Sequence, residues 1–233
     1  MTTIALICIG LVCILILLSI TWHFASRHFS LPCPTWLAWL VELDNPFSKV
    51  HGAQAITDHL LLKPGMKVLD FGCGPGRVTI PIAEQVGPSG EVVAVDIQPN
   101  MLRRAQEKAL ARNLNNIRFL EIGAGQEELH HSYFDRATLV TVLGEVSDRQ
   151  TALKQLFDSL KPGGMLSITE IIFDPHFQSR STVRHLANKI GFQEKEIFGN
   201  RFTFTLNFNK PIGGLNSRSR QKEGGHAPEA GKS

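Results

Sequence analysis

The sequence predicts an α/β fold with a doubly wound, mostly parallel sheet of seven strands. Between residues 52 and 209, short β-type runs alternate with amphipathic helical segments, and this alternation is typical of a parallel sheet covered by helices on both faces. The chain has 233 residues, of which 43% are hydrophobic and 19% charged. This composition provides enough apolar material for one domain core and excludes wholesale disorder.

Apolar periodicity and turn residues place the expected elements in order. The expected strands are 67–71, 91–96, 117–122, 136–143, 165–172, 192–198 and 201–209, and the expected helices are 50–62, 77–86, 101–113, 149–160 and 181–190. Residues 161–164, Lys-Pro-Gly-Gly, are expected to form a turn. The last two strands have no helix between them, so they should form an antiparallel hairpin at Gly199 and Asn200.

Residues 4–22 form an apolar run without a charged side chain. As a helix rising about 1.5 Å per residue, this run would reach about 30 Å, the thickness of a bilayer's hydrocarbon core. We therefore expect the sheet to be preceded by an N-terminal transmembrane helix, an uncleaved anchor over 1–26. A cleaved signal peptide and a buried soluble helix are the alternatives. The first basic side chains, Arg27 and Lys49, follow the run and predict a single-pass membrane protein with its catalytic domain in the cytoplasm.

Two further segments flank the expected domain over 52–209. Residues 27–51 form a juxtamembrane segment in which Trp36, Leu40 and Leu43 share a helical face; this face lies either at the level of the lipid headgroups or on the core of the domain. Residues 210–233 are expected to be a disordered basic tail, which alone accounts for the net charge of +3. Such a small charge predicts no nucleic-acid partner.

A glycine-rich loop follows the first strand, in which Asp70 precedes Gly72, Gly74 and Gly76. Glycines permit a positive φ and the close approach of a ligand, and the helix that follows offers unpaired N–H groups. Asp96 ends the second strand 20 residues after Gly76, an interval at which a carboxylate can accept hydrogen bonds from ribose hydroxyls. These features predict a nucleotide-like ligand at the carboxyl ends of the strands.

Three motifs in order resemble the class I, Rossmann-like S-adenosylmethionine-dependent methyltransferases, in the branch that acts on small-molecule, lipid or quinone-type acceptors. They are DFGCGPG over 70–76, VVAVDIQPNML over 92–102 and LKPGGML over 160–166. The resemblance covers about residues 52–209. It implies an antiparallel seventh strand and S-adenosylmethionine as the cofactor.

The resemblance also implies roles for individual residues. The methionine part of the cofactor would lie along Gly72, Gly74 and Gly76, and Asp70 would hold its amino group. Asp96 would bind the ribose hydroxyls, and Ile97 would lie beside the adenine. The main chain near Leu143 and Gly144 would close the other side of the cofactor site. Cys73 would be structural. Family members often place an acidic residue against the adenine after the third strand, where this chain has Gly-Ala-Gly over 123–125; Gln126 or a backbone carbonyl would take that role.

Methyl transfer depends on alignment and on excluding water, so a dedicated base is not obligatory. The candidates that could orient or deprotonate an acceptor are Glu145, Glu170 and His176, with Asp174 beside them and Tyr133 as a weaker choice. A solvated or capping role is the alternative for each carboxylate. No metal is expected, because the adjacent His130 and His131 point apart and lack companion ligands.

The sequence thus predicts methyl transfer from S-adenosylmethionine to a small-molecule or lipidic acceptor at the cytoplasmic membrane surface. A non-catalytic cofactor-binding or regulatory protein of the same fold remains an alternative. An NAD(P)-dependent oxidoreductase is disfavoured by the GxGxG spacing, because dinucleotide enzymes carry GxGxxG.

Overall fold

The computed structural model describes residues 52–123, 125 and 129–213, together with single residues between Leu6 and Thr21. The expected transmembrane helix lies largely outside the described residues, and the 27–51 segment and most of the 210–233 tail also lie outside them. Within the described part, none of the helices has the length and apolar character needed to cross a bilayer. The described residues of the first segment are helical, and its large apolar side chains are more than half exposed: Leu6, Ile7, Ile9, Ile14 and Leu17.

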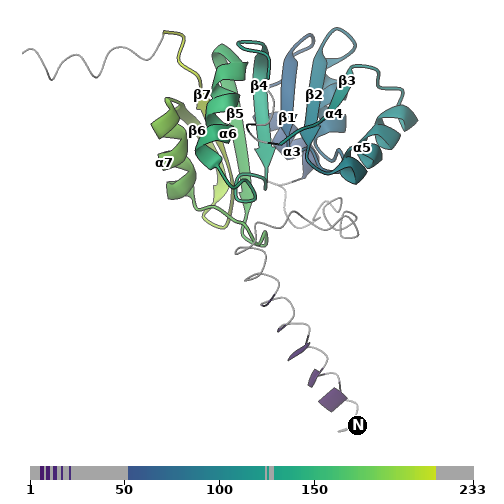
Figure 1. Cartoon of the computed structure of the whole chain (residues 1–233), viewed down its shortest axis with the longest axis vertical. Helices are drawn as coiled ribbons and strands as arrows, with labels where there is room; N and C mark the ends of the chain where they lie inside the picture. Colours follow the sequence, from purple (N-terminus) through teal and green to yellow (C-terminus); the bar gives the residue numbers. More distant parts are fainter. Residues whose placement is uncertain are drawn as a thin grey trace, which may run out of the picture.

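Seven strands form one sheet in the order β3-β2-β1-β4-β5-β7-β6 (Figure 1). Their bounds are β1 Lys67–Phe71, β2 Glu91–Asp96, β3 Ile117–Glu121, β4 Phe134–Val140, β5 Leu160–Ile171, β6 Gln193–Asn200 and β7 Thr203–Asn209. Strands β1 to β5 pair in parallel, whereas β7 runs antiparallel to both β5 and β6. The predicted doubly wound, mostly parallel sheet with an antiparallel last strand is confirmed.

Helices cover both faces of this sheet. Their bounds are α3 Ala53–His59, α4 Thr79–Val86, α5 Pro99–Ala111, α6 Arg149–Ser159 and α7 Arg180–Ile190. Helix α4 contacts both α3 and α5, and α6 contacts α7 on the other face (Figure 1). The Asp148 carboxylate caps α6 by accepting from the Thr151 N–H, and Ser179 caps α7 in the same way through Thr182.

The core lies on both faces of the sheet because consecutive strand residues point in opposite directions. Val68 packs with Ile56, Leu60 and Ile82 under α3 and α4. Its neighbour Leu69 belongs to the larger cluster under α6 and α7, whose members include Val93, Leu139, Leu153, Leu156, Ile168, Val183, Phe204 and Leu206. The central strands β1, β2, β4 and β5 are buried in this way, so mainly their ends are open for a ligand.

The prediction of a turn over 161–164 is wrong, because these residues belong to β5. The Gly163 N–H donates to the Lys210 carbonyl, and the Lys210 N–H donates to the Gly164 carbonyl, both at 2.8 Å. In the β4–β5 ladder, Phe134 pairs with Leu160 and Arg136 pairs with Met165. The additional β5 residues between these two pairs therefore form a bulge. Gly163, with a φ of +79°, adopts the backbone conformation that the bulge requires.

Other boundaries also differ from the prediction. Strand β4 ends at Val140 and not at 143, because Thr141 adopts a φ of +57° and leaves the strand. Helix α3 ends at His59, three residues before the expected end, and Leu61 has a φ of +51°. Lys210, expected in the tail, is held to the domain: its Nζ donates to the Phe157 and Leu160 carbonyls at 2.7 Å each.

Candidate functional site

Five carboxyl groups lie together at the carboxyl ends of the parallel strands. Asp70 and Glu170 each lie one residue before the end of their strands, β1 and β5. Asp96 ends β2, Glu145 follows β4, and Asp174 follows β5. Electrostatic effects on the pKa values connect the five groups: Asp96 acts on Asp70 and on Glu145, and Asp174 acts on Glu145 and on Glu170. The structure therefore brings the predicted acidic residues into one group at the edge where α/β sheets bind ligands.

The glycine loop is bound to the end of β2. The N–H groups of Gly72 and Cys73 donate to the Val95 carbonyl at 2.8 and 2.9 Å, and the Gly74 N–H donates to Asp96 Oδ2 at 2.8 Å. Gly72, Gly74 and Gly76 have φ of +77°, +51° and +80°. All three conformations favour glycine, as the spacing predicted.

The three glycines differ in what surrounds them. A Cβ on Gly72 would lie 2.3 Å from a methyl of Val142, and one on Gly76 would lie 2.9 Å from the Cβ of Ala105. A Cβ on Gly74 would meet nothing within 4 Å. Gly72 and Gly76 are thus required by packing inside the domain, whereas Gly74 faces open space.

Cys73 lies on the inner side of this loop. Its side chain is buried against Ala94 and Leu102, and burial raises the pKa of its thiol well above the usual range. A buried, protonated thiol is a poor nucleophile. The structure thus supports the structural role expected for Cys73.

Asp96 joins the loop to the next helix. Its Oδ2 accepts from Gly74, its Oδ1 accepts from the Gln98 N–H at 2.9 Å, and only 8% of the residue is exposed. Burial raises the pKa of Asp96, and the backbone N–H donors oppose that rise. The next side chain, Ile97, is 55% exposed, so an apolar surface lies directly beside the carboxylate.

Asp70 is buried more deeply than Asp96. Its Oδ2 accepts a hydrogen bond of 2.6 Å from the Thr79 hydroxyl at the start of α4. Burial raises the pKa of Asp70 to about 6; the Thr79 hydrogen bond opposes the rise and the charge of Asp96 adds to it. Sequence reasoning missed Thr79, although a hydroxyl residue in the first turn after a glycine loop is a recognisable pattern.

The segment after β4 is fixed by Arg149, which the sequence did not single out. Leu143 is fully buried, so its side chain belongs to the core. Its carbonyl accepts from Arg149 Nε at 3.1 Å, and the Gly144 carbonyl accepts from Arg149 Nη2 at 3.2 Å. A Cβ on Gly144 would lie 1.8 Å from the His176 carbonyl oxygen, so only glycine lets the β4 and β5 loops pack this closely.

Glu145 and Glu170 have strongly raised pKa values. Burial raises the pKa of Glu145 to about 8, with Asp174 and Asp96 contributing. Glu170 is 1% exposed, and burial likewise raises its pKa to about 8, against the opposing hydrogen bond from the Gln178 N–H to Oε2. Glu170 Oε1 is buried and has no hydrogen-bond partner in the described part of the chain. Both carboxyl groups are therefore mainly neutral at pH 7.

His176 is buried in the loop after β5. Its N–H donates to Asp174 Oδ1 at 2.6 Å, and its carbonyl accepts from Gln178 Nε2 at 2.7 Å. Tyr133 lies elsewhere: its hydroxyl is 2.5 Å from Glu91 Oε2, at the first residue of β2 and therefore at the amino edge of the sheet. Tyr133 is thus not part of the site.

Arg180 was also missed. Its guanidinium carbon lies 5.4 Å from the centre of the Phe204 ring, and Phe204 is opposite Glu170 in the β5–β7 ladder. Arg180 Nε and Nη2 are buried without a hydrogen-bond partner in the part of the chain that the structure describes. Arg180 directly precedes the expected helix over 181–190, and at such a position the sequence does not distinguish a buried arginine from a solvated one.

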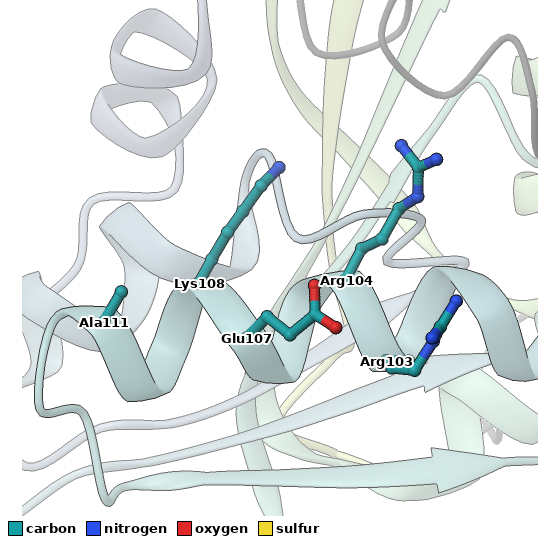
Figure 2. A pocket seen from close by; sticks show the side chains of 5 residues that line it. All are labelled: Arg103, Arg104, Glu107, Lys108 and Ala111. Atoms are coloured by element: carbon teal, nitrogen blue, oxygen red, sulfur yellow. The ribbon is translucent and has the colours of Figure 1, made fainter.

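An open groove of about 600 Å³ lies elsewhere, on the surface of α5 (Figure 2). Its lining residues are Arg103, Arg104, Glu107, Lys108 and Ala111. Lys108 Nζ donates to the Pro75 carbonyl at 2.9 Å and thereby supports the glycine loop from outside. The groove contains none of the strand-end acids. Among the described residues, no group of three side chains could hold a metal ion.

The expected adenine side is described only in part. Ala124 and Gln126 lie outside the described residues. The Gly125 N–H donates to Gln155 Oε1 at 3.0 Å.

Comparison with known proteins agrees with this geometry. The family described as methyltransferase domain matches residues 62–206. A demethylmenaquinone methyltransferase of Geobacillus sp. (strain WCH70) is 34% identical over 145 residues, which are 62% of this chain and 56% of that protein. A ubiquinone/menaquinone biosynthesis C-methyltransferase of Vibrio vulnificus (strain YJ016) is 34% identical over 117 residues, 48% of this chain and 45% of that protein. The chain thus spans about half the length of the curated relatives it matches.

Solved structures share the fold. A SAM-dependent methyltransferase from Aquifex aeolicus superimposes with a TM-score of 0.68 at 22% identity, covering 77% of this chain and 100% of that one. A Haemonchus contortus phosphoethanolamine N-methyltransferase gives a TM-score of 0.62 at 17% identity, covering 75% of this chain and 56% of that one. The chain belongs to the methyltransferase domain family, and its sheet is that of the class I S-adenosylmethionine-dependent methyltransferases.

Proposed function

We propose that this protein transfers a methyl group from S-adenosylmethionine to a small, quinone-type or otherwise lipidic acceptor at the cytoplasmic surface of a membrane. The observation that carries the proposal is the link between Gly74 and Asp96. Gly74 faces open space, and its N–H is bound to a buried carboxylate at the end of β2. This pair combines room for a ligand with a hydrogen-bond acceptor for it.

The residues of the edge fit S-adenosylmethionine in shape and charge. Each Asp96 oxygen has a second lone pair, so the carboxylate can hold ribose hydroxyls in addition to its two backbone donors. The exposed Ile97 side chain offers an apolar surface for the adenine, and Asp70 would hold the amino group. Besides its carboxylate the cofactor carries two positive charges, an ammonium and a sulfonium, and the carboxylates of Asp70 and Asp96 favour these cationic groups.

The acceptor would lie near Glu145, Glu170 and His176. When bound, S-adenosylmethionine supplies a methyl group already activated by its sulfonium. Because Glu145 is only partly buried and mainly neutral at pH 7, it can donate a hydrogen bond to an acceptor oxygen and so position the acceptor for transfer. Glu170 is 1% exposed, so it would support this part of the site from below the surface. The names of the relatives, which include menaquinone and ubiquinone enzymes, support a quinone-type acceptor.

The apolar run over residues 4–22 supports the proposed place at a membrane. It carries no charge, and its described large apolar side chains are exposed. A helix that is apolar on all sides is normally surrounded by lipid or by other protein. We accordingly propose an anchor over 1–26, a juxtamembrane segment over 27–51, a methyltransferase domain over 52–209 and a basic tail over 210–233.

Titration calorimetry of the full chain in lipid nanodiscs tests the cofactor. We expect S-adenosylmethionine and S-adenosylhomocysteine to bind and NADH not to bind. Asp96→Ala should weaken binding about 10- to 100-fold, because hydrogen bonds to a charged group contribute roughly 1.5–3 kcal/mol. Glu107→Ala on α5 removes the same charge outside the site and should change nothing. Binding of NADH alone, or unchanged affinity in Asp96→Ala, contradicts the proposal.

A further inference from the structure

We propose that the carboxyl edge of the sheet docks on a lipid bilayer through an apolar rim formed by Ile172, Phe173 and Phe202. This inference rests on the proposed membrane location. It adds the orientation of the domain: the acceptor side of the site, which is the part near Glu145, Glu170 and His176, faces the bilayer.

The three rim residues lie on two adjoining loops. Ile172 and Phe173 directly follow β5, and Phe202 directly precedes β7. Because β5 and β7 are antiparallel, the end of one and the start of the other lie at the same edge. The Ile172 N–H donates to the Phe202 carbonyl at 2.8 Å, which joins the two loops.

The exposure of the rim suits an interaction surface. The exposed fractions are 38% for Ile172, 87% for Phe173 and 45% for Phe202. Three large apolar side chains that are adjacent and solvent-exposed are typical of an interaction surface and not of scattered surface residues. Aromatic and aliphatic side chains of this kind insert into the boundary between headgroups and acyl chains.

A cation beside the rim favours a lipid surface over a second protein. The Arg201 guanidinium carbon lies 4.5 Å from the centre of the Phe202 ring, so a cation adjoins the apolar surface. Basic residues next to inserted aromatic residues bind anionic headgroups. The cytoplasmic leaflet, on which the proposed orientation places the domain, carries such lipids.

The rim also lies next to the acceptor side of the site. Asp174 follows Phe173 directly and acts electrostatically on both Glu145 and Glu170. An acceptor dissolved in the bilayer would therefore reach these carboxyl groups past the rim. This arrangement would spare an apolar substrate a passage through water.

Because of the proposed anchor, a small apolar rim is sufficient to dock the domain on the bilayer. An apolar surface of this size binds a bilayer only weakly by itself. The apolar run ends at residue 22, and the described domain begins at residue 52; even fully extended, the intervening chain spans no more than about 100 Å. Such a tether keeps the domain near the lipid and raises the effective concentration of the rim at the bilayer surface.

Spin-label accessibility in the full chain tests the orientation. Cys8, Cys13 and Cys33 are replaced by Ser, buried Cys73 is kept, and a nitroxide is attached to Phe173→Cys in nanodiscs containing anionic lipid. Leu110→Cys is the matched control, because Leu110 is 73% exposed and lies at the end of α5, at the opposite edge of the sheet. We expect the label at 173 to be at least fivefold less accessible to a water-soluble nickel chelate than the label at 110, and more accessible to oxygen.

Two results would overturn the inference. Equal nickel accessibility at both positions would place Phe173 in water, and dipolar broadening between labels at 173 would place the rim against a second copy of the chain. Alkaline carbonate washing of membranes separates this failure from that of the proposed location. A chain that is washed off lacks the anchor, whereas a retained chain with a water-exposed label lacks only the docked rim.

Discussion

The buried carboxyl of Glu170 couples folding of the domain to pH. Its pKa is about 8 in the folded state and 4.5 without the fold, so between these values the folded protein holds a proton that the unfolded chain has lost. Stability therefore falls as pH rises from about 4.5 to 8 and levels off above 8. Glu145 contributes in the same direction.

We predict that Glu170→Gln, which is neutral at every pH, flattens this dependence. Each pKa unit corresponds to about 1.4 kcal/mol, so the variant should be more stable than the parent chain by at least about 2 kcal/mol at pH 8 and nearly equal to it at pH 5. Urea unfolding followed by circular dichroism at several pH values measures the difference. Glu107→Gln on α5 is the control, and a slope shared by all three proteins contradicts the prediction.

The hydrogen bond from Thr79 to Asp70 is a second residue-scale feature with a measurable consequence. Both side chains are buried, and the bond measures 2.6 Å. Thr79→Val keeps the shape but leaves the carboxylate without this donor, so we expect a loss of about 1–3 kcal/mol in unfolding free energy. Without the hydroxyl the pKa of Asp70 should rise further, so the loss should be greater at pH 8 than at pH 5. A loss that does not depend on pH would contradict this explanation.

At the scale of the elements, different glycines of the loop serve packing and ligand binding. Gly76→Ala would place a Cβ against Ala105, whereas Gly74→Ala would place it in open space. We expect Gly76→Ala to lower the melting temperature more than Gly74→Ala, which carries only the cost of a positive φ, about 1–2 kcal/mol. Gly74→Ala should instead weaken S-adenosylhomocysteine binding at least tenfold. Equal affinity in Gly74→Ala and the parent chain would show that the ligand does not approach this glycine.

The elements also show how far sequence patterns determine the fold. The bounds of β1 and β2 were predicted correctly because buried parallel strands are short apolar runs between clear turn residues. The bulge in β5 could not be predicted, since it depends on pairing with Lys210, 46 residues after Gly164. The acids of the site follow strand ends and were recognisable. Arg149 acts through the loop just before its own helix, at the Gly144 carbonyl, and Arg180 acts through a tertiary contact with the Phe204 ring; neither contact follows a recognisable sequence pattern.

For the whole molecule, the position of the site predicts where a bound cofactor protects the chain. The carboxyl ends of β1, β2 and β4 meet at one edge, whereas the turn over 87–90 and the β5 bulge lie at the other. Hydrogen–deuterium exchange with and without S-adenosylhomocysteine should show slower exchange in 72–79, 96–101 and 143–149. Exchange in 87–90 and 161–164 should not change. Because ligand binding stabilises the native state as a whole, the comparison must use short exchange times, at which local opening dominates over global unfolding. Protection centred on 103–111 would instead place the ligand in the groove on α5, and the strand-end acids would then require another role.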